Sequence, residues 1–257
     1  MLRVTLPLTA LTLLHCFPLA PDSLLAADKW PETFDWGHIE SNETDIAFHI
    51  TNPPSNRVVR VPRLFNSYEQ LFLLNGEPEQ KVMMKPEVDH WLITLPKDAG
   101  DSPIVMMTTV DKPRHPDNVK AVRPEKDQTL RLPACLASVH GEKLRFEPQP
   151  HKNTVGYWTV ADDWCEWQIE LPKEAAYEIQ IWQGCGKGQG GSEVDLIAGD
   201  ETLPFTVEDT GHFQNFRQRS IGSITLKAGK QSLQLRPSKK ANKAVMDVRL
   251  IVLKPID

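Results

Sequence analysis

Residues 165–171 read CEWQIEL, and their side chains alternate between apolar and polar without a break. In an extended chain, successive side chains point to opposite faces. Cys165, Trp167, Ile169 and Leu171 therefore share one face, and the three polar residues between them share the other. This alternation predicts a β-strand with one buried face.

The same period of two extends over most of the chain. After residue 27, no segment keeps apolar residues at helical spacing for three turns. Short strands separated by Pro, Gly and Asn are typical of β-sandwiches and jelly rolls. The sequence therefore predicts an all-β protein, with a tight hairpin turn at Asn75-Gly76. Further strands are expected at 45–51, 57–61, 70–74, 90–95, 104–110, 177–181, 193–198, 203–207, 220–226, 231–236 and 245–253.

A segment rich in proline and charge separates the two groups of strands. Residues 111–128 contain three prolines and no apolar run that a core could bury, as is typical of a linker. We therefore expect a β-sandwich domain at 28–110 and a second β-sandwich domain at 129–257. A chain of 257 residues has room for both.

Residues 1–27 have the layout of a secretory signal peptide. Arg3 precedes a mostly apolar stretch at 4–20, and the small residues Ala26 and Ala27 precede Asp28. The apolar stretch contains two prolines and is shorter than the roughly 20 residues that a membrane span needs. We expect a secreted or periplasmic protein without a membrane span.

Loss of the signal peptide would remove Cys16 and leave Cys135, Cys165 and Cys185, so one disulfide at most is expected. Cys165 and Cys185 could pair if their strands form a hairpin, and free thiols are the alternative.

The distribution of charge indicates which classes of binding partner to expect. A net charge of -5 argues against nucleic acid as the main partner. Residues 217–257, however, carry ten Lys or Arg against two Asp. This basic segment could attract an anionic polysaccharide, or it could keep a sheet edge soluble.

The second half of the chain, from about residue 146 to 254, resembles family 6 and related carbohydrate-binding modules. That group has a jelly-roll, galactose-binding-like fold. The matching motifs, in order, are Gly156-Tyr157-Trp158, Asp162-Asp163-Trp164, Ala176-Tyr177, the segment 210–216 (TGHFQNF) and the segment 226–230 (LKAGK).

In such modules, aromatic side chains at the loop end of the sandwich stack on sugars, and an asparagine before the last strand bonds hydroxyls. The present chain departs from that pattern, because its last strand begins with 244–247 (AVMD) and Asn242 lies a few residues too early. The resemblance implies Tyr157 or Trp158 and Phe213 as the aromatic residues that stack on the sugar, with His212 beside them and Asn215 in the same motif. Lys187, in the glycine-rich segment, could also reach the ligand.

Related modules often hold a structural calcium ion near the first strand. The resemblance therefore implies Glu147 and Asp247 as calcium ligands, and no other cofactor is expected.

The first half, from Trp36-Gly37 to Thr94-Leu95-Pro96, is similar to the small β-sandwich that follows the catalytic barrel in family 29 α-L-fucosidases. A barrel needs about 250 residues, and none is seen in this sequence. The similarity leaves open an accessory or remnant part of a fucosidase-like glycoside hydrolase, acting beside a glycosidase partner.

Catalytic motifs are not found. Asp162-Asp163 and Glu208-Asp209 are neighbours along the chain, so we expect them to be surface turn residues rather than a glycosidase pair. The glycine run at 184–191 leads into a predicted strand, which favours a flexible loop over a phosphate loop. The eight histidines are scattered, and none is expected to bind zinc.

These features predict a secreted, non-catalytic carbohydrate-binding protein that recognises an oligo- or polysaccharide through loop aromatics. The alternatives are the fucosidase-like accessory part and a protein-interaction β-sandwich without a sugar ligand.

Overall fold

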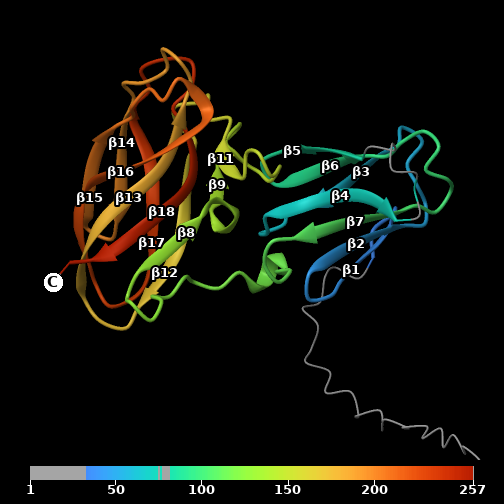
Figure 1. The fold of residues 1–257 in the computed structure, drawn as a ribbon, viewed down its shortest axis with the longest axis horizontal. Helices are drawn as coiled ribbons and strands as arrows, with labels where there is room; N and C mark the ends of the chain where they lie inside the picture. The colour runs from blue at the N-terminus through green and yellow to red at the C-terminus, as the bar shows by residue number, and fades with distance from the viewer. Residues whose placement is uncertain (1–32, 75, 77–81, 257) are drawn as a thin grey trace, which may run out of the picture.

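The computed structural model describes residues 33–74, 76 and 82–256, which form two groups of β-sheets side by side (Figure 1). The expected all-β class is confirmed. Besides strands and loops, the described residues contain two 3-10 turns, η1 (Pro116–Asn118) and η2 (Ala134–Leu136). None of these described residues forms a helix long and apolar enough to cross a membrane. The expected signal peptide and Asn75 of the expected hairpin lie outside the described residues.

The first group is a sandwich of two antiparallel sheets. Inward-facing side chains such as Phe48, Val59, Trp91 and Val105 are completely buried. One sheet has the order β1 (Gly37–Ser41), β2 (Asp45–Ile50), β7 (Ile104–Thr109), β4 (Tyr68–Leu74), and the other β3 (Val58–Pro62), β6 (His90–Thr94), β5 (Met83–Pro86).

The second group consists of a six-stranded and a five-stranded sheet. The six-stranded sheet has the order β10 (Arg145–Glu147), β11 (Thr154–Gly156), β18 (Asp247–Pro255), β13 (Ala175–Cys185), β16 (His212–Leu226), with β8 (Leu130–Pro133) also paired to β18. The five-stranded sheet has the order β15 (Glu201–Thr206), β14 (Glu193–Ala198), β17 (Gly229–Lys239), β12 (Trp164–Leu171), β9 (Ser138–His140).

Strand β12 confirms the alternation on which the fold prediction rests. Cys165, Trp167, Ile169 and Leu171 are buried, whereas the three polar residues between them are half-buried or exposed. The indole N–H of Trp167 donates to the carbonyl oxygen of Pro133 at 2.9 Å, so its one polar atom is satisfied inside the core.

The expected hairpin between β12 and β13 is wrong. Strand β12 pairs with β17 and β9, whereas β13 pairs with β16 and β18 in the other sheet. The turn after Leu171 therefore carries the chain from one layer to the other. Cys165 and Cys185 lie on different sheets, and both are buried free thiols. Burial raises the pKa of the Cys185 thiol to about 11.

Asp163 corrects the expectation that the pair Asp162-Asp163 is a surface turn. Its side chain is completely buried, and its carboxylate accepts the backbone N–H groups of Glu142, Lys143 and Leu144 at 2.7–2.9 Å. Asp162 is exposed. Asp163 therefore fixes the turn before β10 and is not available for catalysis.

The expected linker at 111–128 is partly bound to the second group of sheets. Val122 forms a parallel bridge to Ile169, with its N–H donating to the Gln168 carbonyl oxygen at 2.8 Å. The two groups also contact each other directly. The guanidinium of Arg63 donates to the carbonyl oxygens of Cys135 and Ala137 at 3.3 and 2.7 Å.

Candidate functional site

A cavity of about 260 Å³ opens beside the six-stranded sheet of the second group. Strands β11, β18, β13 and β16 are neighbours in that sheet, so the starts of β16 and β18 lie close to the end of β11. The loops that flank these strand ends complete the wall. The lining residues are Glu147, Lys152, Tyr157, Trp158, Thr159, Phe213, Gln214, Ala244 and Asp247.

Tyr157 is the exposed aromatic residue of the cavity, with 49% of its surface accessible. Its φ of 59° lies in the left-handed region, which is uncommon for a residue with a side chain and is often found at functional sites. The guanidinium of Arg145 lies 3.9 Å from the ring centroid and braces the ring by a cation–π contact. Tyr157 thus offers a flat aromatic ring that is half exposed and is held in place by Arg145.

Phe213 forms a second aromatic part of the wall and is half-buried. Gly186 makes room for its ring, because a Cβ at that position would lie 2.6 Å from the Phe213 Cε2 atom. The ring position therefore depends on the glycine-rich segment that follows β13. In this segment Gly188 donates its N–H to the carboxylate of Asp209, which holds the loop against the residues before β16.

Trp158 does not present its ring to solvent as a loop aromatic would. The side chain is completely buried, and its indole N–H donates to the carbonyl oxygen of Asp163 at 2.9 Å. The expectation that it is an open stacking platform is therefore wrong. Trp158 is instead a structural part of the cavity wall.

Two carboxyl groups lie in the polar part of the cavity. Glu147 is 5% exposed and accepts a bond from the ammonium of Lys152 at 2.8 Å. Asp247 is 4% exposed, and the Gln214 amide approaches its Oδ2 at 3.4 Å. Burial, and then the nearby negative charge of Glu147, raise the pKa of Asp247 to about 8. At neutral pH this carboxyl group is largely protonated and can donate a hydrogen bond.

This arrangement does not fit the calcium ion that Glu147 and Asp247 were expected to hold. Calcium takes six to eight oxygen ligands, mostly from ionised carboxylates, carbonyls and water. Here the cavity lining offers two carboxyl groups, and one of them, Glu147, is already paired with the Lys152 ammonium at 2.8 Å. Lys152 places a positive charge where the ion would need to approach.

About half of the chain is similar to solved carbohydrate-binding modules. The C-terminal family 6 module of LamC from Zobellia galactanivorans is 20% identical, with a TM-score of 0.41, and the match covers 49% of this chain and 98% of that module. A family 35 module from Clostridium thermocellum is 10% identical, with a TM-score of 0.42, and the match covers 48% and 97%.

A longer match extends into the first half. The α-L-fucosidase from Vibrio sp. strain EJY3 is 14% identical, with a TM-score of 0.35, over 86% of this chain and 40% of the enzyme. The chain thus spans less than half of the fucosidase's length. No protein-family profile matches the sequence, and no curated protein has significant sequence similarity to it.

Three of the expected ligand-binding residues do not line the cavity. His212 and Asn215 belong to β16, and their side chains bond the local backbone: His212 Nδ1 accepts the N–H of Gln214, and Asn215 donates to Thr210. Lys187 is exposed on the glycine-rich loop. Phe213 does line the cavity, but it lies on strand β16 rather than in the loop where it was expected.

Sequence reasoning missed Lys152, Thr159, Gln214 and Ala244. Gln214 lies within the quoted motif 210–216 but was not singled out, and Thr159 directly follows the motif Gly156-Tyr157-Trp158. Lys152 gave no such signal, because its role comes from the turn that brings it to Glu147.

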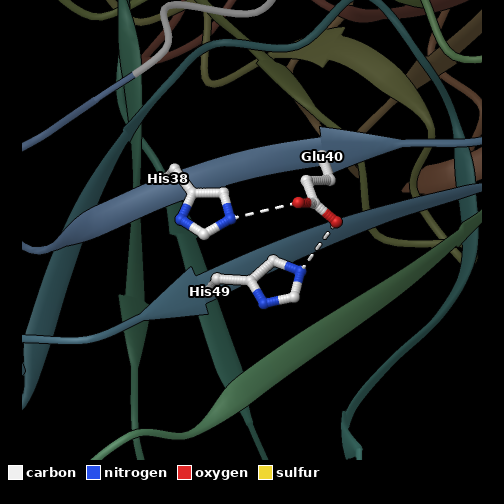
Figure 2. Close-up of side chains that lie close together, drawn as sticks. All are labelled: His38, Glu40 and His49. Atoms are coloured by element: carbon white, nitrogen blue, oxygen red, sulfur yellow. Dashed lines mark hydrogen bonds and ion pairs between the residues drawn. The ribbon is translucent and has the colours of Figure 1, made fainter.

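The histidines are less scattered than the sequence suggested. Among the described residues, His38, Glu40 and His49 form one group whose ligand atoms all lie within 4.8 Å of one another. The spacing was missed because it joins two strands. Figure 2 shows the three side chains together on neighbouring strands.

Proposed function

We propose that the protein is a secreted or periplasmic, non-catalytic carbohydrate-binding protein, with its ligand site in the cavity of the second domain. One observation carries this proposal. A half-exposed Tyr157 and a half-buried Phe213 line the same cavity as Gln214 and Asp247.

That combination suits the two sides of a sugar. The C–H face of a pyranose ring can be desolvated against an aromatic face, while amides and carboxyl groups bond its hydroxyl edge. Tyr157 provides the exposed face, since Arg145 supports its ring. Gln214 and Asp247 provide polar atoms inside the cavity. The volume of about 260 Å³ is enough for roughly one sugar unit, with the rest of a chain extending into solvent.

A neutral sugar suits the cavity better than an anionic one. Lys152, the positively charged residue of the cavity lining, is already paired with Glu147, so the described lining gives a carboxylate or sulfate no free cation to bind. The basic segment at 217–257 is also partly neutralised, because Arg219, Lys227 and Lys239 form ion pairs with Glu208, Asp200 and Glu193 at 2.8–3.2 Å. An anionic polysaccharide remains the alternative ligand class.

The experiment is a glycan array on the purified protein, followed by titration of the best neutral and uronic-acid ligands. Tyr157→Ala should weaken binding by about tenfold, which corresponds to the loss of one aromatic contact. Phe72→Ala is the matched control, because Phe72 is a comparably exposed aromatic residue, 38% accessible, on the first domain. Binding that survives both Tyr157→Ala and Phe213→Ala would refute the site.

The same titrations test the absence of catalysis. A bound oligosaccharide should be recovered intact after long incubation. Release of new reducing ends that is abolished by Asp247→Asn would instead identify Asp247 and Glu147 as a hydrolytic pair. If the protein works as an accessory part, addition of the protein should increase the rate of a separate glycosidase on the polymer that it binds.

A further inference from the structure

His38, Glu40 and His49 form a cluster on the outer face of the first domain, away from the proposed sugar site. His38 and His49 lie directly opposite each other in the antiparallel pair β1–β2. Glu40 is two residues after His38, so its side chain points to the same face. All three side chains therefore project from one side of the sheet, as Figure 2 shows.

The cluster is held by the core below it. Ile39, which lies between His38 and Glu40, and Phe48, which precedes His49, point inward and are almost or completely buried. The backbone positions of the three side chains are therefore set by the packing of the sandwich. Little conformational freedom has to be lost to bring them together.

The ligand atoms of the three side chains lie within 4.8 Å of one another. Nε2 of His38 lies 3.2 Å from Oε1 of Glu40, and Nε2 of His49 lies 3.2 Å from Oε2. The imidazole rings are stacked, with centroids 4.6 Å apart and an angle of 2° between their planes. Both histidines thus present the same nitrogen to the same carboxylate.

We propose that this cluster is a binding site for a divalent transition-metal ion of the zinc class. Two imidazole nitrogens and a carboxylate oxygen are ligands that such an ion prefers. Bound at about 2.0–2.1 Å, neighbouring ligand atoms of one ion are separated by roughly 3.3 Å, close to the spacings in the cluster. Without an ion, the carboxylate would accept N–H groups from both rings. When a metal binds, each neutral imidazole carries its proton on Nδ1 instead, which frees Nε2 to coordinate.

Three protein ligands leave at least one coordination position for water. The side chains of His38, His49 and Glu40 are 37, 25 and 65% accessible, so an ion can enter from solvent without any movement of the fold. Magnesium and calcium are disfavoured, because they prefer sites made of oxygen ligands.

The test is calorimetric titration of the purified protein with Zn²⁺, together with the visible absorption spectrum after Co²⁺ addition. We expect saturable binding of one ion. His38→Ala and His49→Ala should each weaken it by about tenfold or more, and Glu40→Gln should also weaken it. The Co²⁺ spectrum should change in the same variants.

His140→Ala is the matched control, because His140 Nε2 lies 3.1 Å from Glu166 Oε1 but has no second histidine in the pair. It should leave Zn²⁺ affinity unchanged. Circular dichroism of each variant checks that it is folded. Absence of saturable binding, binding that survives both histidine substitutions, or an equal loss in His140→Ala would overturn the proposal.

Discussion

At the scale of single residues, the raised pKa of the cavity residue Asp247 makes the stability of the fold depend on pH. Its pKa is raised from the ordinary 3.8 to about 8 in the folded protein. Between these pH values the folded state binds a proton that the unfolded state does not. Asp247 therefore contributes stability that is complete below about pH 4 and is lost as the pH rises through 8.

Asp247→Asn should remove this dependence, because the amide stays neutral at every pH. We expect the variant to be more stable than the wild type by on the order of 5 kcal/mol at pH 9, with little difference at pH 4. Urea unfolding at pH 4, 7 and 9 measures the effect. The exposed Asp162→Asn is the control and should follow the wild type, whereas parallel curves for wild type and Asp247→Asn would contradict the raised pKa.

At the scale of elements, Gly184 allows β13 and β16 to approach where the pairing is irregular. The register shifts between Gln183 and Cys185, and a Cβ at Gly184 would lie 1.8 Å from the backbone oxygen of Phe213. Because that atom belongs to the backbone, only movement of the strand could relieve the clash. The position of Phe213 in the cavity therefore depends on this glycine.

Gly184→Ala should lower the free energy of unfolding by about 3 kcal/mol and weaken ligand binding together with it. Gly188→Ala is the control. It has a φ of 73° but no atom within 4 Å of its Cβ position, so only the backbone cost of about 1 kcal/mol is expected. Equal losses in the two variants, measured by urea unfolding, would refute the steric explanation.

At the scale of the whole molecule, Arg63 connects the two domains. It is 6% exposed, donates to the carbonyl oxygens of Cys135 and Ala137, and lies 4.0 Å from the Phe65 ring centroid. Ser67 adds a hydrogen bond of 2.7 Å to Asn153. Buried carbonyls that lose their donor keep the cost of desolvation, so the Arg63 side chain contributes strongly to this interface.

Arg63→Ala should lower stability by about 3 kcal/mol and let the two domains move independently. Small-angle scattering should show a larger radius of gyration, and proteolysis should cut faster within 111–128. Arg60→Ala is the control, because the Arg60 side chain is 64% accessible and its ion pair with Asp89 is 3.5 Å long. An unchanged scattering curve for Arg63→Ala would show that other contacts hold the domains together.

The alternation of side chains was enough to predict the all-β class and most strand positions. Burial of one face follows directly from a period of two, as in Cys165 to Leu171. Strand ends were less predictable: β16 begins at His212 rather than near 220, because it continues across the register shifts in its pairing with β13.

The motifs that resemble carbohydrate-binding modules identified Tyr157 and Phe213 as ligand-binding candidates, and the same resemblance gave Glu147 and Asp247 as calcium ligands. Only the tertiary structure decided that these four share a cavity, that Trp158 is buried, and that Lys152 pairs with Glu147. The same holds for His38 and His49, which are neighbours only through the register of β1 and β2. The reason is physical: local patterns determine which face of a strand is buried, whereas strand pairing and sheet packing determine which distant side chains meet.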